Sequence, residues 1–274
     1  MTTIKGKSVL ITGASRGIGK RLAMGFAAVG ANVGLLARSQ SEIDLALLEI
    51  EQAGGVAMRL RADVREPDEL AHAVERMRAK FGGLDILIVA AGVQGPIGPF
   101  LTSKAKAWNE TVETNLIGAA NSCRVALPPM IEKRSGKIIL IAGGGSAYSR
   151  PNFTAYAASK SALVRFGETL ADEVRDHNVQ VNTIAPGAAY SAMTDEILQA
   201  GEARAGRKEI EDAEKVRVTG GVAAEKQIAL ALFLASEKSN HISGKLIHVN
   251  DDWKRFEQDN MKAELYTLRR VQKV

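Results

Sequence analysis

The sequence predicts an α/β fold, a doubly wound parallel sheet of seven strands with helices on both faces. Two observations indicate this fold class. Short, almost continuously apolar runs alternate with longer segments whose apolar residues recur at helical spacing, and glycine or proline marks many of the boundaries. Runs that are apolar throughout are typical of parallel strands buried on both faces. The length of 274 residues suits one large domain, which we expect over residues 1–250.

The elements follow in order along the chain. Strands are expected at SVLIT (8–12), NVGLLA (32–37), VAMRLRA (56–62), ILIVA (86–90), KIILIA (137–142), VQVNTIA (179–185) and KLIHVN (245–250). Helices are expected over 16–29, 42–53, from 67 onward, and over 111–132, 155–177 and 225–236. Ser41 is the expected N-cap of the second helix, and Pro67 is well placed near the start of the third.

Two regions depart from this alternation. Residues 191–222 are polar and lack a strong apolar face, so we expect a mobile helical excursion over the site. Residues 251–274 follow the last strand and contain Trp253, Phe256 and Tyr266. We expect this C-terminal extension to pack on the domain or on a neighbouring subunit.

Composition narrows the possible functions. The single cysteine, Cys123, excludes an internal disulfide framework and favours a reducing cytoplasm. The four histidines are scattered, so no metal site is predicted. The apolar runs are too short to span a membrane, and no signal peptide is apparent. The net charge of +5 favours an anionic ligand. The sequence has no basic stripe interleaved with aromatic residues, so we do not expect the protein to bind nucleic acid.

The run TGASRGIG, residues 12–19, lies between the first strand and the first helix. Gly13 permits a tight turn, Gly17 allows close backbone approach, and Gly19 lets the helix pack closely on the strand. The helix N-terminus then offers free N–H groups and a positive dipole end to a pyrophosphate. The strand–turn–helix context indicates a Rossmann-like dinucleotide site.

The end of the second strand selects the cofactor. A carboxylate there would bind the ribose 2′-hydroxyl of NAD. The sequence instead has Ala37, Arg38 and Ser39, and Arg16 adds a second cation from the glycine turn. Guanidinium groups can hold a 2′-phosphate bidentately, so NADP is predicted, with NAD less favoured.

Tyr156 and Lys160 are four residues apart and therefore share one face of a predicted helix. A tyrosine has an ordinary pKa of about 10, and a nearby ammonium favours the phenolate and lowers that pKa. Tyr156 could then donate a proton to a carbonyl oxygen or accept one from an alcohol. Lys160 could also bind the hydroxyls of the nicotinamide ribose.

Thr-Gly-x-x-x-Gly-x-Gly, followed about 140 residues later by Tyr-x-x-x-Lys, is the paired signature of the short-chain dehydrogenases/reductases. The chain resembles this family from Lys7 to Asn250, in an NADP-preferring form. The resemblance implies that Asp63 contacts the adenine and that Asn115 helps to hold a proton-relay water. It further implies that Pro186 and Gly187 lie beside the nicotinamide. Cofactor contacts are expected from Gly13, Ser15, Arg16, Gly17, Ile18, Gly19, Arg38, Ser39, Asp63, Val64, Ala91, Gly92, Tyr156, Lys160, Pro186 and Gly187.

Two places depart from the family pattern. The usual Asn-Asn-Ala-Gly is Val89-Ala90-Ala91-Gly92, which removes asparagine amides that support the sheet. The usual catalytic serine, thirteen residues before the tyrosine, is Gly143. Ser146 could swing in, a backbone N–H of Gly143 or Gly144 could donate instead, or the protein could bind cofactor and do little chemistry. The expected catalytic residues are Tyr156, Lys160, Asn115 and Ser146.

The sequence therefore predicts a short-chain oxidoreductase that uses NADP. It would transfer a hydride between nicotinamide and a ketone or secondary alcohol. Three substrate classes remain open: a 3-oxoacyl thioester carried by acyl carrier protein, a sugar or polyol, and a small ketone. The alternative is a catalytically weak, dinucleotide-binding regulatory or scaffold protein. The resemblance implies a homo-oligomer, a dimer or often a tetramer, built on the long helices that begin near Thr111 and Ala155.

Overall fold

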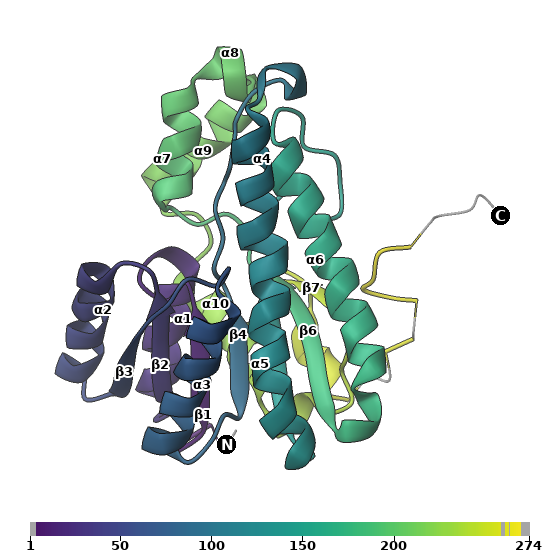
Figure 1. Cartoon of the computed structure of the whole chain (residues 1–274). Coiled ribbons are helices and arrows are strands. Elements are labelled where there is room, and N and C mark those ends of the chain that lie inside the picture. Colours follow the sequence, from purple (N-terminus) through teal and green to yellow (C-terminus); the bar gives the residue numbers. More distant parts are fainter. Residues whose placement is uncertain (1–3, 259–260, 263, 270–274) are drawn as a thin grey trace.

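The computed structural model describes residues 4–258, 261–262 and 264–269. Its centre is one seven-stranded sheet in the order β3-β2-β1-β4-β5-β6-β7, and every pairing is parallel (Figure 1). The strand order reverses between β1 and β4, which is where doubly wound sheets bind ligands. The strands are β1 (Ser8–Thr12), β2 (Asn32–Ala37), β3 (Val56–Arg61), β4 (Ile86–Val89), β5 (Gly136–Ile141), β6 (Val179–Ala185) and β7 (Leu246–His248).

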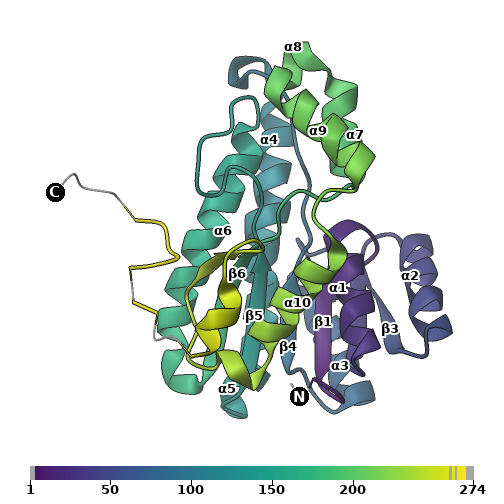
Figure 2. The ribbon, with the colours of Figure 1, turned by 180° about the vertical axis from the view of Figure 1, so that it is seen from behind.

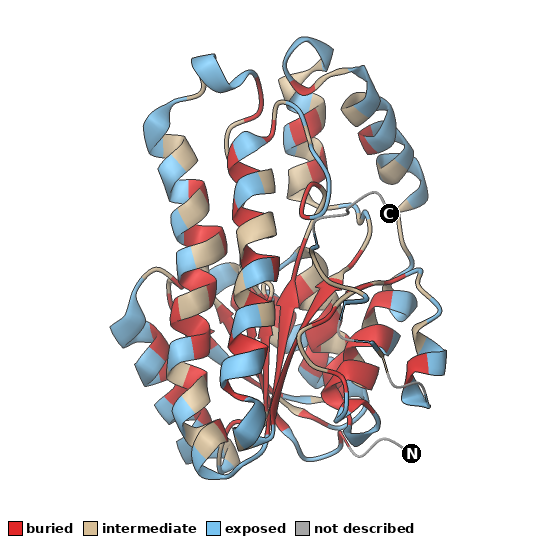
Figure 3. Cartoon of the chain, turned by 90° about the vertical axis from the view of Figure 1, so that its right-hand side faces the viewer, coloured by how far each residue is buried: buried red, intermediate tan, exposed pale blue. Residues whose placement is uncertain are grey.

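Helices cover both faces of the sheet, as the apolar strands predict (Figures 1 and 2). One apolar cluster joins the sheet to α1 (Gly17–Ala28), α2 (Gln40–Gln52) and α10 (Ala224–Ala235). The other joins it to α3 (Pro67–Phe81), α5 (Gly118–Glu132) and α6 (Thr154–Glu173). The inner strands β1, β2, β4, β5 and β6 are almost wholly buried between these layers, whereas the edge strands β3 and β7 are partly exposed (Figure 3). Short 3-10 turns lie at η1 (Phe100–Thr102), η3 (Arg175–His177), η4 (Glu237–Ser239) and η5 (Trp253–Glu257).

Several predicted boundaries differ by a few residues from the structure, and two of the differences bear on the site. The helix expected over 111–132 begins earlier, as α4 (Ala105–Val112), and continues through a π-helical turn, η2 (Glu113–Ile117), into α5. Residues 105–110 are mostly exposed and show little apolar periodicity, so their sequence carries no helical signal. The N-cap of α2 is Ser39, which is extended and accepts a hydrogen bond from the Glu42 N–H, rather than Ser41.

The excursion predicted over 191–222 is helical. It forms α7 (Ala192–Ala200), α8 (Glu202–Ala205) and α9 (Arg207–Thr219), which we call the cover helices. They lie beyond the carboxyl ends of the strands, near the starts of α4 and α6 (Figure 1). The Arg204 guanidinium donates to the Ile97 carbonyl at 2.7 Å, which joins the cover helices to the loop after β4. That this segment moves stays a prediction.

The described part of the C-terminal extension packs on its own chain. The Trp253 ring lies 5.2 Å from the Phe233 ring of α10, and Phe256 is buried. The Leu246 N–H of the edge strand β7 donates to the Tyr266 carbonyl at 2.7 Å. Residues 259–260, 263 and 270–274 of the predicted extension lie outside the described residues. Within the described part of the chain, no helix is long and apolar enough to cross a membrane.

Candidate active site

The predicted site residues gather at the carboxyl edge of the sheet. The glycine turn follows β1, Ala90 to Val93 follow β4, Gly143 follows β5, and Pro186 follows β6. The helices η2 and α6 bring Asn115, Tyr156 and Lys160 to the same edge. The chain order of these residues is scattered, and parallel pairing alone places them together.

The glycine turn has the geometry of a pyrophosphate cradle. A Cβ atom on Gly13 would lie 2.7 Å from the Ala91 Cα, so only glycine fits that close approach. Gly17 has φ +56°, and a Cβ there would meet nothing nearer than the Ser191 Cβ at 3.8 Å. No side chain caps α1 at Arg16, so the first N–H groups of the helix are available to an anion. These residues fit a dinucleotide.

The end of the site that is predicted to hold the adenosine carries charges of both signs. The Arg38 guanidinium is exposed and lies 3.9 Å from an Asp63 carboxylate oxygen. Arg16 lies 3.9 Å from Glu42, and the Ser15 hydroxyl donates to that carboxylate at 2.9 Å. The sequence analysis missed Glu42, because its position in the first turn of α2 reads as ordinary helix-dipole compensation.

Asp63 is held mainly by a second missed residue, Arg65. The guanidinium of Arg65 donates to both carboxylate oxygens, the shorter bond being 2.6 Å. This hydrogen bonding holds the pKa of Asp63 below its ordinary value. The Glu69 carboxylate also accepts from the Asp63 N–H at 2.7 Å, so three carboxylates, those of Glu42, Asp63 and Glu69, balance the guanidinium groups of Arg16, Arg38 and Arg65 at this edge.

The missing asparagines after β4 are replaced from elsewhere. The Thr12 hydroxyl accepts hydrogen bonds from the N–H groups of Ala90 and Ala91, both at 3.2 Å. The Asn115 side chain accepts from the Val93 N–H at 2.8 Å and donates to the Val93 carbonyl at 3.0 Å. Thr12 and Asn115 therefore hold the backbone of this segment, which agrees with a structural reading of the departure.

Asn115 lies in the π-helical turn η2, a conformation often found at functional sites. Its second amide hydrogen goes to the Ser159 hydroxyl at 3.0 Å. Both donors of the amide are thus used, so the side chain has only acceptor capacity left for a water. A Cβ on Gly92 would lie 3.2 Å from the Asn115 Oδ1 and 3.5 Å from the Lys160 Nζ, so glycine there keeps the space between them open.

Lys160 and Tyr156 are both buried on α6. The Lys160 Nζ donates to the Ile141 carbonyl at 2.8 Å, and burial lowers the pKa of Lys160 to about 8. Burial also raises the pKa of Tyr156, and Arg150, a residue that the sequence analysis missed, counteracts this. In the protein by itself burial outweighs Arg150, so the pKa of the phenol lies above its ordinary value, and a lowering of that pKa by Lys160 stays a prediction.

The glycine run after β5 packs closely around the tyrosine. A Cβ on Gly143 would lie 2.2 Å from the Tyr156 Oη. The carbonyls of Gly145 and Ser146 accept from the Ser161 hydroxyl, farther along α6 than Tyr156. Gly143 therefore lies directly against the phenol, while the Ser146 carbonyl is bound to Ser161.

The segment after β6 is also fixed by its neighbours. The Gln227 side chain of α10 donates to the Pro186 carbonyl at 2.9 Å. Gly187 has φ +69°, and a Cβ there would lie 2.6 Å from the Val222 side chain. On the opposite side of the site, Val64 is buried against Gly118 of α5, and Ile18 packs on the core.

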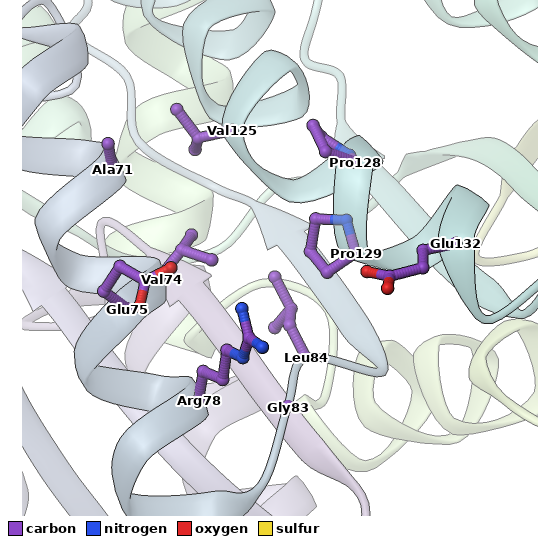
Figure 4. Close-up of a pocket in the computed structure, with 10 residues that line it drawn as sticks. All are labelled: Ala71, Val74, Glu75, Arg78, Gly83, Leu84, Val125, Pro128, Pro129 and Glu132. Atoms are coloured by element: carbon purple, nitrogen blue, oxygen red, sulfur yellow. The ribbon is translucent and has the colours of Figure 1, made fainter.

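A hollow of about 320 Å³ lies between α3 and α5, away from these residues (Figure 4). Leu84, Pro129 and Arg78 are among its lining residues. Arg78 lies near the end of α3, Pro129 near the end of α5 and Leu84 just before β4. These positions place the hollow at the amino edge of the sheet. This hollow therefore takes no part in the candidate site.

Comparison with known proteins identifies the family. Residues 7–202 match the family described as short chain dehydrogenase. The chain is a short-chain dehydrogenase/reductase. As a family member, it is an oxidoreductase that acts on CH–OH and keto groups of a small-molecule substrate.

Several relatives of this short-chain dehydrogenase/reductase are known by name. The chain is 31% identical over 247 residues to the 3-oxoacyl-[acyl-carrier-protein] reductase FabG of Staphylococcus aureus, covering 89% of this chain and 96% of that one. It is 34% identical to the Escherichia coli FabG, covering 90% and 96%.

Solved structures agree with the fold. A short-chain type dehydrogenase/reductase from Mycobacterium ulcerans superposes with a TM-score of 0.79 at 28% identity, over 89% of this chain and 88% of that one. A gluconate 5-dehydrogenase from Burkholderia cenocepacia, solved with NADP and tartrate, also has a TM-score of 0.79, at 25% identity over 89% and 93%. These likenesses support nicotinamide dinucleotide binding in general.

Proposed function

We propose that the chain is an NADP-dependent oxidoreductase that interconverts a ketone and a secondary alcohol. The observation that carries the choice of NADP is the pair of arginines, Arg16 and Arg38, that flanks the predicted position of the adenosine ribose. Both guanidinium groups are more than half exposed and are only loosely paired, at 3.9 Å. They are therefore available to a 2′-phosphate, which Arg binds bidentately.

Tyr156 is the proposed proton donor and acceptor. In the reductive direction its hydroxyl protonates the carbonyl oxygen, and in the oxidative direction its phenolate takes the alcohol proton. The nicotinamide supplies or accepts the hydride when bound. Lys160 is proposed to bind the ribose hydroxyls, and its place beside Asn115 and Gly92 suits that role.

The donor to the substrate oxygen is proposed to be a main-chain N–H. Within residues 4–258, the N–H groups of Gly143 and Gly144 make no hydrogen bond, whereas the Ser146 N–H donates to the Gly143 carbonyl. Loss of one preorganised donor typically costs about 10²–10³ in rate. A backbone N–H that binds the substrate oxygen at this position would therefore contribute to the rate by a factor of that size. Ser146 remains the second candidate for this role.

The substrate class is proposed to be a 3-oxoacyl thioester or a sugar acid or polyol. The FabG relatives support the first class and the gluconate 5-dehydrogenase supports the second. The cover helices carry the residues that would distinguish them.

We also propose the wider organisation of the protein. Residues 1–250 form one oxidoreductase domain and residues 251–274 an extension that packs on it, as the contacts of Trp253 and Tyr266 suggest. A cytoplasmic homo-oligomer, a dimer or tetramer that uses α4 to α6, is the proposed assembly. Light scattering coupled to size-exclusion chromatography tests the assembly directly.

One experiment tests the function. The protein is titrated with NADPH and NADH by fluorescence, and turnover is then measured on a 3-oxoacyl thioester, a 5-keto sugar acid and simple ketones. Tight NADPH binding with turnover on one class supports the proposal. Tight binding without turnover on any class points to a regulatory or scaffold role, and preference for NADH contradicts the cofactor assignment.

A further inference from the structure

Arg150 lies in the loop between β5 and α6, and its side chain is only 11% exposed. The centre of its guanidinium stacks on the Phe153 ring at 3.9 Å and lies 5.6 Å from the centre of the Tyr156 ring. Its Nε and Nη2 donate to the two carboxylate oxygens of Glu209, at 2.9 and 2.7 Å. A cation so fixed and so little exposed is unusual unless its position matters.

Gly145 is the glycine that lets the Arg150 side chain pack so closely. A Cβ on Gly145 would lie 3.0 Å from the Arg150 Cβ, whereas one on Gly144 would make only an ordinary contact of 3.7 Å with the Arg150 Nη1. The same run leaves room for the Tyr156 hydroxyl at Gly143. Gly143 thus makes room for the phenol, and Gly145 makes room for Arg150.

The charged and titratable groups around the phenol come from three elements. On α6, the Lys160 Nζ lies 5.9 Å from the centre of the Tyr156 ring but donates to the Ile141 carbonyl. The loop contributes Tyr148 and Arg150, and α9 contributes Glu209 through Arg150. Burial raises the pKa of the Tyr156 phenol, Arg150 lowers it, and Tyr148 raises it.

We propose that Arg150 is a positioning residue for proton transfer at Tyr156, and that Glu209 of α9 holds its guanidinium over the ring. This inference rests on the proposed function of Tyr156. In alcohol oxidation, the phenolate takes the hydroxyl proton of the substrate while the hydride leaves for the nicotinamide. Arg150 adds to the stabilisation of the phenolate that this step requires. The cover helices thereby contribute to the chemistry through Glu209 as well as enclosing the site.

The test compares wild type with Arg150→Met in the full-length protein. An opposite charge at about 4–6 Å changes a pKa by about 1–3 units, and Glu209 offsets part of this, so we expect an upward displacement of about one pH unit. The acid limb of the pH profile for alcohol oxidation should move up by this amount, with roughly tenfold lower kcat on that limb and little change in KM. Independently, ¹³Cζ-tyrosine NMR with saturating NADP⁺ should show that Tyr156 ionises at a higher pH in Arg150→Met than in wild type.

Matched variants separate this role from a structural one. Arg150→Lys keeps the charge and should restore most of the wild-type profile. Arg207→Gln removes a cation from α9, the helix that carries Glu209. Arg207 forms an exposed pair with Glu202, so this variant should leave the pH profile unchanged. Glu209→Gln should alter the profile of wild type but have no further effect in Arg150→Met, because Glu209 acts through Arg150.

The outcomes are distinguishable. A folded Arg150→Met protein with an unchanged pH profile and an unchanged Tyr156 resonance would overturn the inference. An equal shift from Arg207→Gln would do the same, since it would indicate only a general effect of net charge. If no alcohol or ketone is turned over, the proposed function fails, and the NMR titration still decides whether Arg150 controls the phenol. Tyr156→Phe assigns the resonance among the four tyrosines.

Discussion

The hydroxyl of Tyr156 occupies the space that a side chain at Gly143 would need. A Cβ atom on Gly143 would lie 2.2 Å from the Tyr156 Oη, inside any permitted contact. The position that commonly carries the catalytic serine in this family is therefore incompatible with that serine unless the tyrosine moves. The position of the Tyr156 hydroxyl thus requires glycine at residue 143, so the missing serine is a packing requirement of this site.

Gly143→Ser should consequently fail to improve the enzyme. We expect turnover to fall by at least tenfold and the free energy of unfolding to fall by about 1–3 kcal/mol, the usual cost of overpacking. Gly144→Ala is the matched control, because its Cβ would meet the exposed Tyr148 hydroxyl at 3.3 Å and that side chain can move. Steady-state kinetics and urea unfolding measure both effects. A Gly143→Ser protein with raised kcat would contradict the packing argument.

Tyr156→Phe and Ser146→Ala should behave differently. Removing the phenolic hydroxyl should lower kcat by about 10²–10⁴, the usual contribution of a general acid or base. Ser146→Ala should stay within about twofold of wild type if a backbone N–H is the donor. NADPH oxidation with the preferred ketone measures both. A loss of about 10²–10³ in Ser146→Ala would instead identify that hydroxyl as the donor.

Charge substitutions at the adenosine end should change cofactor choice. Arg38→Asp should weaken NADPH binding by about tenfold or more, because a charge-assisted contact worth about 1.5–3 kcal/mol is replaced by repulsion. Glu42→Gln should tighten NADPH binding a few-fold, since a carboxylate near Arg16 is removed. Arg59→Gln is the control, since Arg59 of β3 forms an exposed pair with Asp44 of α2. Fluorescence titrations with NADPH and NADH check all three, and equal losses of both cofactors in Arg38→Asp would argue against a 2′-phosphate site.

Lys137 should make stability depend on pH. Burial lowers its pKa from 10.5 to about 7, with the Glu237 carboxylate opposing the effect, so the unfolded chain binds more protons between these values. The free energy of unfolding should therefore rise from pH 7 towards pH 10, by up to about 1.4 kcal/mol for each pH unit. Below pH 7 the destabilisation caused by burying the Lys137 ammonium is fully present.

Lys137→Met isolates this contribution. The variant should be more stable than wild type at pH 7, and its stability should rise less steeply with pH. Lys160, whose pKa burial lowers to about 8, accounts for a remaining rise above that pH. Urea unfolding at pH 7 and pH 9 measures the difference. Parallel curves for the two proteins would show that Lys137 keeps its charge in the fold.

The sequence by itself determined the fold and most of the site. Apolar runs such as ILIV of β4 and helical spacing around Leu22 and Phe26 dictate the alternation, because each must bury its apolar face. The glycine turn, Arg38, Tyr156 and Lys160 were readable because their chemistry depends on local spacing. The start of α4 was not readable, since residues 105–110 are held through contacts such as that of the Trp108 indole with the Thr154 hydroxyl.

Only the tertiary structure decided which groups face one another. Glu42 and Arg65 join the adenosine end, Thr12 replaces missing asparagine amides, and Glu209 reaches Arg150 across 59 residues of chain. It also decided that Lys160 donates to Ile141 while Arg150 lies over Tyr156. Hydrogen bonds and charge interactions act over a few ångströms in space, whereas sequence patterns record only distances along the chain, so these pairings emerge when the layers of the fold pack together.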